Sequence, residues 1–260
     1  MNIQSMSAIF FFVVPILIIL IMLIRMGKRL DFYEYGLLSS GSVLLSSLLY
    51  FLLYSQLVGH SAFDTMWNTF RQNFLSGGVD AGQILAFYHS LGFFQNFTAA
   101  DQLAEYLILQ MKAVVPAAIL IFSLVYGVIG LLVIRLILKK TGHEMPEVRA
   151  FEDWSLPRGM VVGLIVLLLI SLLGGSLGIS NFEVVRFTIT ALISFLFTVI
   201  GLSFLWFFLK AGRVPSVLRW LLTVITCLIA GFVLPFLGMF DQLFHLRWRY
   251  RNKFLFKNGR

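Results

Sequence analysis

Residues 8–26, AIFFFVVPILIILIMLIRM, contain no charged side chain before Arg25. A helix needs roughly 20 mostly apolar residues to cross the hydrocarbon core of a bilayer. Because lipid offers no hydrogen bonds to the backbone, a run of this length is predicted to be a transmembrane helix. The whole chain has the same character, with 59% hydrophobic residues, 12% charged residues and a mean hydropathy of +0.92. Since a soluble domain carries roughly 25% charged residues, we predict a polytopic integral membrane protein.

Five further apolar runs have the length of a membrane span. The fold class we predict is all-α: one membrane domain over residues 1–260, built as a polytopic integral membrane bundle of about six transmembrane helices. The predicted spans are residues 8–26, 35–58, 113–138, 159–178, 184–209 and 220–240.

The segment between the second and third spans, residues 59–112, is predicted to form an interfacial helical cap on the outer face. SAFDTMWNTFRQNFL (61–75) has apolar residues at helical spacing, and ILAFYHSLGFF (84–94) fits a second short helix. TAAD (98–101) fits a capping box with Thr98 as N-cap and Asp101 reaching back to it. From there a helix is expected to run on into the third span.

Lysine and arginine in the loops predict which side of the membrane each loop occupies. Three basic loops fall on one side and are predicted to be cytoplasmic: Arg25, Lys28, Arg29; Arg135, Lys139, Lys140, Arg149, Arg158; and Lys210, Arg213, Arg219. We therefore predict a multi-pass protein of the bacterial inner (plasma) membrane.

The basic tail, residues 241–260, contradicts this simple count. Six crossings place the tail outside, while its charge favours the cytoplasm (Arg247, Arg249, Arg251, Lys253, Lys257, Arg260). Either the last apolar run does not cross fully, or the tail is an exception, or one predicted span is wrong. Pro235 and Gly238 make a broken final helix plausible. The side of the tail stays open at this point.

Catalytic or metal chemistry has no support in the sequence. The four histidines, at 60, 89, 143 and 245, form no metal-binding pair, and Cys227 is the only cysteine. No phosphate-cradling glycine loop or nucleophile elbow is present. We therefore predict no catalytic residues, no metal, no cofactor and no enzyme activity.

A ligand site can be predicted from the second span and the cap. Ser39, Ser42 and Ser46 share one helix face and can line a site for a small, largely uncharged ligand, with lid residues Trp67, Phe70, Tyr88 and Tyr106. The alternative for the serines is close helix packing, with hydroxyls bonded to their own helix. The alternative for the aromatic residues is a belt that holds the bundle at the membrane interface.

Two further segments are predicted to contact a partner or lipid. Asp153, Trp154, Pro157 and Arg158 lie at the start of the fourth span, where Arg158 can reach a lipid phosphate. In the tail, Asp241, His245 and Arg249 recur every four residues and are expected to pair along one helix face, with Arg247 beside them. Anionic headgroups are the expected contact, and nucleic acid is disfavoured although arginine alternates with aromatic residues there. Glu183 and Arg186 are expected to form a pair at the start of the fifth span.

Three stretches carry a family resemblance: PAAILIFSLVYGVIGLLVIRLILKKTG (116–142) leading to FEDWSLPRG (151–159), FLFTVIGLSFLWFFLKAGRVPSVLR (195–219), and LGMFDQLFHLRWR (237–249). Together they resemble the YybS-like family of uncharacterised bacterial membrane proteins (domain of unknown function 2232) over roughly residues 113–252. That family more distantly resembles the substrate-binding S components of energy-coupling factor transporters, which are six-helix bundles that hold a vitamin near the outer face.

Two functions follow as hypotheses. The first is a transporter component that binds a small, largely uncharged ligand on the outer face and docks a membrane or ATPase-linked partner subunit. The alternative is a non-transport scaffold for cell-envelope or cell-shape machinery, in which Trp154–Arg158 and the basic tail contact partners. The sequence predicts neither the ligand nor the partner by identity.

Overall fold

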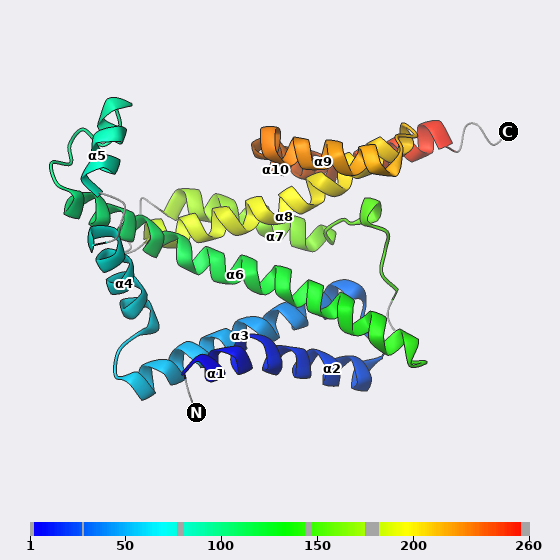
Figure 1. The fold of residues 1–260 in the computed structure, drawn as a ribbon. Coiled ribbons are helices and arrows are strands. Elements are labelled where there is room, and N and C mark those ends of the chain that lie inside the picture. The colour runs from blue at the N-terminus through cyan, green and yellow to red at the C-terminus, as the bar shows by residue number, and fades with distance from the viewer. Residues whose placement is uncertain (1–2, 28, 77–80, 144–146, 175–181, 256–260) are drawn as a thin grey trace. The chain divides into compact units, whose positions relative to one another are not determined.

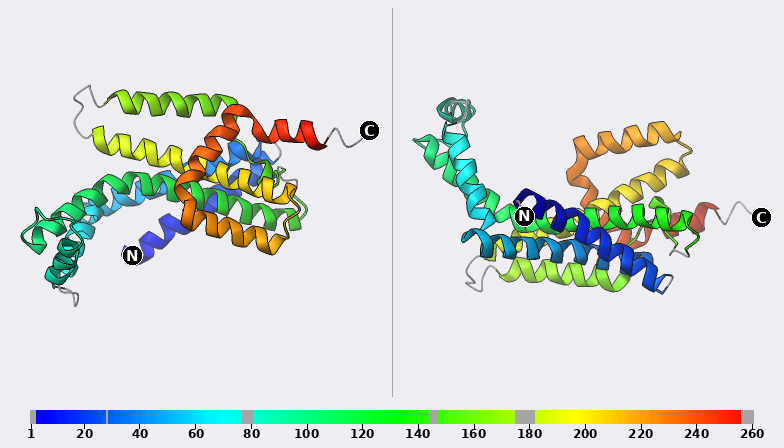
Figure 2. Two further views of the ribbon diagram at one scale, coloured as in Figure 1. Left: turned by 90° about the horizontal axis from the view of Figure 1, so that it is seen from above. Right: turned by 60° about the horizontal axis from the view of Figure 1, so that its bottom comes forward.

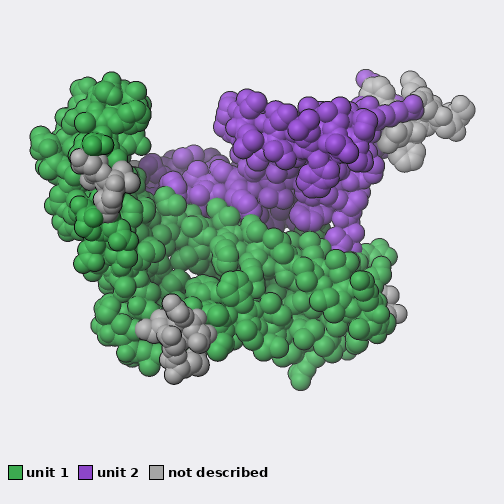
Figure 3. Space-filling view, viewed as in Figure 1, with its two compact units in different colours: residues 1–147 green, residues 148–260 purple. Residues whose placement is uncertain are grey.

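The computed structural model describes residues 3–27, 29–76, 81–143, 147–174 and 182–255, and in these ranges the chain is helical between short turns, without strands (Figure 1). The all-α prediction is thereby confirmed. Residues 175–178 of the predicted fourth span, Lys28, Lys257 and Arg260 lie outside the described residues. The chain divides into two compact units, residues 1–147 and 148–260, coloured separately in Figure 3. Each unit is described by itself.

Unit 1 contains the first three predicted spans and the cap. Its helices are α1 (Ile3–Ala8), the π-helical turn η1 (Ile9–Val13), α2 (Val14–Met26), α3 (Phe32–Val58), α4 (Ala62–Ser76), α5 (Ala81–Ser90) and α6 (Ala100–Lys140). Helices α4 and α5 confirm the two cap helices predicted between the second and third spans. Helix α6 confirms the prediction that one helix runs from the cap into the third span.

The predicted start of α6 differs in its capping. The N-cap is Ala99, which has no capping side chain, and the capping box at Thr98 is wrong. The Asp101 carboxylate instead accepts a hydrogen bond from Arg71 Nη2 of α4 at 2.8 Å, while Gln102 Oε1 accepts one from the Thr98 N–H at 2.8 Å. Asp101 is thus used to hold α4 against α6, because an arginine offers a charged partner that the Thr98 backbone cannot match.

Helices α3 and α6 pack through a seam of small residues. A Cβ at Gly127 of α6 would lie 2.5 Å from the backbone nitrogen of Ser40, so only glycine permits this approach. Along the seam, Ser40 and Ser47 donate to their own helix, at the carbonyls of Gly36 (2.7 Å) and Val43 (2.8 Å). These two hydroxyls are therefore satisfied within α3, whereas the buried Ser39 Oγ has no hydrogen-bond partner among the described residues.

Unit 2 contains η2 (Phe151–Asp153), α7 (Arg158–Leu173), α8 (Phe182–Ala211), α9 (Ser216–Ala230), η4 (Gly231–Val233), α10 (Leu234–Phe244), α11 (Leu246–Tyr250) and η5 (Arg251–Leu255). Helices α7 and α8 form an antiparallel hairpin (Figure 2). Val161 near the start of α7 shares a buried cluster with Ile193 and Phe197, and Gly174 beyond its end lies against the ring of Phe182.

Five described segments are long and apolar enough to cross a membrane: Met6–Met26, Phe32–Val58, Ala100–Lys140, Phe182–Ala211 and Ser216–Phe244. Helix α7, within the predicted fourth span, is apolar but shorter, with 16 residues. At about 1.5 Å per residue its described part spans about 24 Å, compared with about 30 Å for a hydrocarbon core.

The last apolar segment of unit 2 is broken and turns back. Helix α9 ends at Ala230, the 3-10 turn η4 follows, and α10 begins at Leu234, with Pro235 in its first turn. A proline has no N–H to continue the preceding helix, which accounts for a break at this position.

Contacts with α8 locate both ends of this segment. At its start, the Arg219 guanidinium lies 5.1 Å from the Trp206 ring and Trp220 packs edge-on against the same ring. After it, Tyr250 packs against Phe207 and Phe208. The two ends of the segment therefore meet α8 at the same end, near its C-terminus.

Candidate functional site

The candidate site lies where α10 crosses α8, and glycines set the distance between the two helices. A Cβ at Gly201 of α8 would lie 2.1 Å from the Leu234 carbonyl oxygen, and one at Gly238 of α10 would lie 2.1 Å from the Phe197 carbonyl oxygen. Neither position can hold a larger residue without separating the helices. Because the two helices cross this closely, the end of α10, which carries Asp241, lies against the C-terminal half of α8.

A buried ion pair forms at that point. Asp241 and Arg247 are 3% and 8% exposed, and Asp241 Oδ2 accepts hydrogen bonds from Arg247 Nη2 at 2.6 Å and Nε at 2.8 Å. The Arg247 backbone N–H adds a bond to Asp241 Oδ1 at 3.2 Å. A pair buried this deeply requires its remaining polar groups to be bonded, because desolvation of each ion is costly.

The other donors of Arg247 are used to hold the loop before α7. Nη1 donates to the Glu152 carbonyl at 2.7 Å and to Ser203 Oγ at 2.9 Å, and Nη2 donates to the Trp154 carbonyl at 2.8 Å. All five N–H groups of the guanidinium therefore have an acceptor. Ser203, on α8, in turn donates to the Phe151 carbonyl at 2.6 Å. One arginine thus joins η2, α8 and the tail.

Surface ion pairs complete this arrangement, which we call the basic corner (residues 149–158, 203–210 and 241–251). Lys210 on α8 pairs with Glu152, and Arg251 pairs with Asp153. The hydrogen bond from Lys210 lowers the pKa of the Glu152 carboxyl below its ordinary value, against the opposing effect of burial. The two acidic residues of η2 therefore each have a basic partner, one from α8 and one from the tail.

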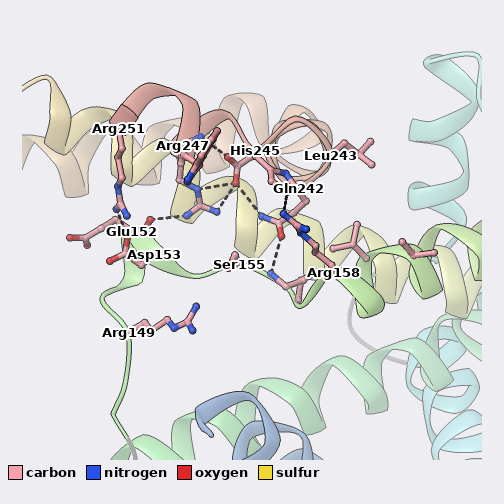
Figure 4. A pocket seen from close by; sticks show the side chains of 15 residues that line it. Arg149, Glu152, Asp153, Ser155, Arg158, Gln242, Leu243, His245, Arg247 and Arg251 are labelled. Atoms are coloured by element: carbon pink, nitrogen blue, oxygen red, sulfur yellow. Dashed lines mark hydrogen bonds and ion pairs between the residues drawn. The ribbon is translucent and has the colours of Figure 1, made fainter. Parts of the chain in front are cut away.

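A pocket of about 870 Å³ opens beside the ion pair (Figure 4). Its charged lining includes Arg149, Arg158, Arg247 and Arg251, and an apolar wall is formed by Leu156, Val161, Val162, Leu243 and Trp248. Pockets of roughly 300–1,000 Å³ are typical of small-molecule sites. The pocket thus combines guanidinium groups with an apolar surface, in a size suited to an organic ligand.

His245 has an unusual conformation at the mouth of this pocket. Its φ and ψ are 52° and 46°, in the left-handed region that non-glycine residues seldom adopt. This residue ends α10 and separates it from α11. Its Nε2 atom lies 3.2 Å from Arg158 Nη2. Because arginine can only donate, Nε2 is the acceptor in this contact.

The same conformation corrects one sequence prediction. Asp241, His245 and Arg249 were expected to pair along one continuous helix face, but the helix is broken at His245. The reversal at His245 allows Asp241 to meet Arg247 instead, and His245 contacts Arg158. The expected i,i+4 stripe is therefore wrong, although Asp241, His245 and Arg247 all belong to the corner. Arg249 is exposed.

The segment predicted to contact a partner or lipid lies in the same place. Asp153, Trp154 and Arg158 each belong to the basic corner, and Pro157 precedes the first residue of α7. The Trp154 indole N–H donates to the Arg149 carbonyl at 3.2 Å. The structure thus brings together two predicted groups that are about 90 residues apart in sequence.

The predicted outer site is divided between two places in unit 1. Ser42 is half-buried and donates to the Leu38 carbonyl at 2.9 Å, Ser46 donates to the Phe10 carbonyl in η1, and Ser39 is buried with no hydrogen-bond partner for its Oγ among the described residues. At about 1.5 Å per residue, Ser46 lies about 18 Å before the end of α3 at Val58, after which the cap begins. The serine face therefore lies away from the cap, between packed helices.

The aromatic residues of that predicted site fall into two groups within the cap. Tyr88 and Tyr106 both pack against Phe94, at ring distances of 5.3 and 5.5 Å. Trp67 is buried on α4, and Phe70 stacks on Phe74 of the same helix. These contacts fit a cap that is held together by aromatic packing, and ligand binding by this set stays a prediction.

Sequence reasoning missed Ser203, Glu152 and Gln242 as members of the corner. Gln242 Nε2 donates to Asp241 Oδ2 at 3.1 Å, and its Oε1 accepts the Leu156 N–H at 3.0 Å. Ser203 could have been predicted from one feature of the sequence: it is a polar residue in an apolar span, two positions after a glycine. Glu152 and Gln242 gave no such signal, since Glu152 lies in a polar loop and Gln242 at the end of an apolar run, where a polar residue is ordinary.

The apolar helices, the small-residue crossings and the charges gathered at helix ends define a multi-pass integral membrane protein. Residues 2–242 match the family model described as "Predicted membrane protein (DUF2232)", and the chain belongs to this family. It is similar to the Uncharacterized protein YybS of Bacillus subtilis (strain 168), with 22% identity over 211 residues, which cover 78% of this chain and 64% of that protein.

The family resemblance predicted from three stretches of sequence is thereby confirmed. The chain matches slightly less than two thirds of the length of YybS. No solved structure matches the chain. The likeness to energy-coupling factor S components stays a prediction.

Proposed function

We propose that this protein is a ligand-binding component of a membrane transport system and that its ligand occupies the pocket of the basic corner. The observation that carries the proposal is this pocket, formed where the last helix is interrupted at His245 beside a buried ion pair. Transport proteins commonly bind their substrates where a membrane helix is interrupted, because the interruption exposes polar groups inside the bundle.

The proposal includes a membrane topology for unit 2. The last apolar segment enters from and returns to one side of the membrane, so that the loop before α7, the loop after α8 and the tail share that side. Every described lysine and arginine of unit 2 except Arg186 then lies at that end (Arg149, Arg158, Lys210, Arg213, Arg219, Arg247, Arg249, Arg251, Lys253). The positive-inside rule assigns this end to the cytoplasm. The conflict between the charge of the tail and the number of crossings disappears.

A partner subunit is part of the proposal because the pocket faces the side where an energising ATPase would lie. The ligand differs from the one predicted from sequence: it is bound at the cytoplasmic end and meets guanidinium groups, which favour an anion. The uncharged ligand predicted at the outer face is a separate prediction, and the serine hydroxyls that it needs are mostly bonded to backbone carbonyls.

Native mass spectrometry of the detergent-extracted full chain tests the proposal. We expect a bound small molecule that is lost in Val162→Trp, because Val162 lines the pocket and is 61% exposed. Val166→Trp is the matched control, since Val166 lies one turn further along α7 and is also exposed. A chain that carries no ligand, or one that carries it equally in Val162→Trp, would contradict the proposal. Recovery of envelope-assembly proteins without a ligand would favour the scaffold.

A further inference from the structure

From the charges of the pocket we infer that its ligand carries a phosphate group, which is held by Arg158 with His245 behind it. This inference rests on the proposed ligand-binding function and adds the chemical class of the ligand. The argument begins with the acidic residues of the lining. Asp241 is bonded to Arg247, Asp153 to Arg251, and Glu152 to Lys210. Each carboxylate in the lining already has a cation as partner.

Arg158 differs from the other arginines whose partners are described above. Its guanidinium donates to an imidazole nitrogen that has no negative charge, so the contact orients the group without neutralising it. Arg149 also lines the pocket, and in Figure 4 it is set apart from Arg247. The Arg158 guanidinium has no carboxylate partner among the described residues, and an anion in the pocket would balance its charge.

The conformation of His245 supports a positioning role for this residue. A left-handed backbone is strained at a non-glycine residue, and such positions persist where the surrounding structure fixes them. Here the conformation directs the ring to Arg158 at the pocket mouth. A glycine would make the same turn without strain but would leave Arg158 without its partner.

The position of the pocket and its apolar wall favour phosphate over other anions. Arg158 is the first residue of an apolar helix, a position from which a guanidinium can reach a lipid phosphate. A guanidinium binds phosphate oxygens through two parallel hydrogen bonds, and the start of α7 adds a favourable partial charge. Val162 and Leu243, both exposed in the wall, can contact the apolar body that carries the phosphate.

Two sources could supply this group, a phospholipid headgroup or a free phosphate compound, and the experiment separates them. Calorimetric titration of the full chain in neutral detergent micelles uses inorganic phosphate as the probe, with acetate at equal ionic strength as the comparison. In parallel, native mass spectrometry compares retention of phosphatidic acid with retention of diacylglycerol, which has the same chains and lacks the phosphate.

We expect binding of phosphate in the first assay, which indicates a free ligand, or selective retention of phosphatidic acid in the second, which indicates a lipid. Either should weaken by about tenfold or more in Arg158→Gln, the usual effect of losing a charge-assisted bond, and less in Arg158→Lys. Arg186→Gln is the control, because Arg186 pairs with Glu183 at the other end of α8. An unchanged unfolding temperature verifies that Arg158→Gln is folded.

Three results would overturn the inference: binding in neither assay, acetate binding as tightly as phosphate, or equal losses in Arg158→Gln and Arg186→Gln. Different results would contradict the proposed ligand-binding function. If Val162→Trp removes a co-purified ligand that phosphate and phosphatidic acid do not displace, the pocket binds a ligand of another class. If Val162→Trp has no effect on any ligand, the pocket itself is excluded.

Discussion

Both units bring helices together at glycines, but they treat their polar side chains in opposite ways. At the seam of unit 1, Gly127 meets the backbone of Ser40, and Ser40, Ser46 and Ser47 donate to carbonyls of their own helix or of η1. At the basic corner of unit 2, Ser203 and Arg247 bond to a different segment of the chain. The seam joins two helices and has one buried hydroxyl, Ser39 Oγ, without a hydrogen-bond partner among the described residues, whereas the corner joins three segments beside a charged pocket.

The seam therefore has the features of a packing interface, and the basic corner has those of a functional site. In a bilayer, small polar residues can be tolerated wherever their own helix satisfies them, so a serine face alone says little about ligands. A buried charge is different, because it persists only where other groups are arranged around it. Variants that remove one member of each arrangement should therefore have unequal effects on the two units.

The largest effect is expected from Asp241→Asn. It removes the negative charge that balances the buried guanidinium of Arg247, a loss worth about 3–5 kcal/mol of unfolding free energy in comparable buried pairs. Denaturant unfolding in micelles measures this change. Arg249→Gln, which alters an exposed arginine of the same tail, should behave like the unaltered chain. Equal stability of Asp241→Asn and the unaltered chain would show that the pair does not hold the corner.

The second largest losses of unfolding free energy are expected at the glycine contacts, one in each unit. Gly201→Ala places a methyl group 2.1 Å from the Leu234 carbonyl, and Gly127→Ala places one 2.5 Å from the Ser40 nitrogen. We expect losses of about 1–3 kcal/mol for each, as for other overpacked sites. Gly163→Ala on α7, where no atom lies within 4 Å, is the control. A neutral Gly201→Ala would mean that α10 does not cross α8 this closely.

The serines provide the sharpest comparison of the two units. Ser203→Ala removes an acceptor of the buried Arg247 and should cost about 1–3 kcal/mol. Ser47→Ala removes only a bond to a carbonyl of its own helix and should cost less than about 0.5 kcal/mol. Both are measured by the same unfolding assay. If the two variants lose equal stability, the distinction between seam and corner is not valid.

The smallest effect concerns pH. Because Lys210 lowers the pKa of Glu152 in the folded protein, this contact stabilises the fold above the ordinary carboxyl pKa of 4.5. The contribution is lost as the pH falls through the lowered pKa. Lys210 is exposed, so we expect under about 1 kcal/mol. Lys210→Met should reduce stability at pH 7 and flatten its decline below about pH 4.5 in pH-dependent melting. An equally steep decline in both proteins would exclude the contact as its cause.

Sequence alone predicted the helical membrane class, the cap helices and the family, because apolar run length and helical periodicity are local properties. It also predicted Asp153, Trp154, Arg158, Asp241, His245 and Arg247 as contact residues, although it left open what they contact. It could not predict that they meet. That depends on the Gly201–Gly238 crossing and on the break at Ala230–Leu234, which bring together residues that are far apart in sequence.

The tail shows most clearly what a local sequence pattern cannot predict. A periodic spacing of four residues predicted one helix face, yet the backbone of His245 turns left-handed and ends the helix. Local pattern favours the helix there, and the Asp241–Arg247 pair favours the turn. A buried ion pair that joins three segments overrides the weak i,i+4 contacts of an exposed face, which are worth about 0.2–0.5 kcal/mol each.

The most direct test is the sidedness of unit 2, because the basic corner requires its three segments to lie on one side of the membrane. Single cysteines at Glu183, Arg213 and Asn252, in a Cys227→Ser background, are labelled in intact cells with a membrane-impermeant maleimide. We predict labelling at residue 183 only, and labelling at residues 213 and 252 after permeabilisation. Labelling of residue 252 together with residue 183 in intact cells, while residue 213 stays protected, would contradict the returning segment and the corner built on it.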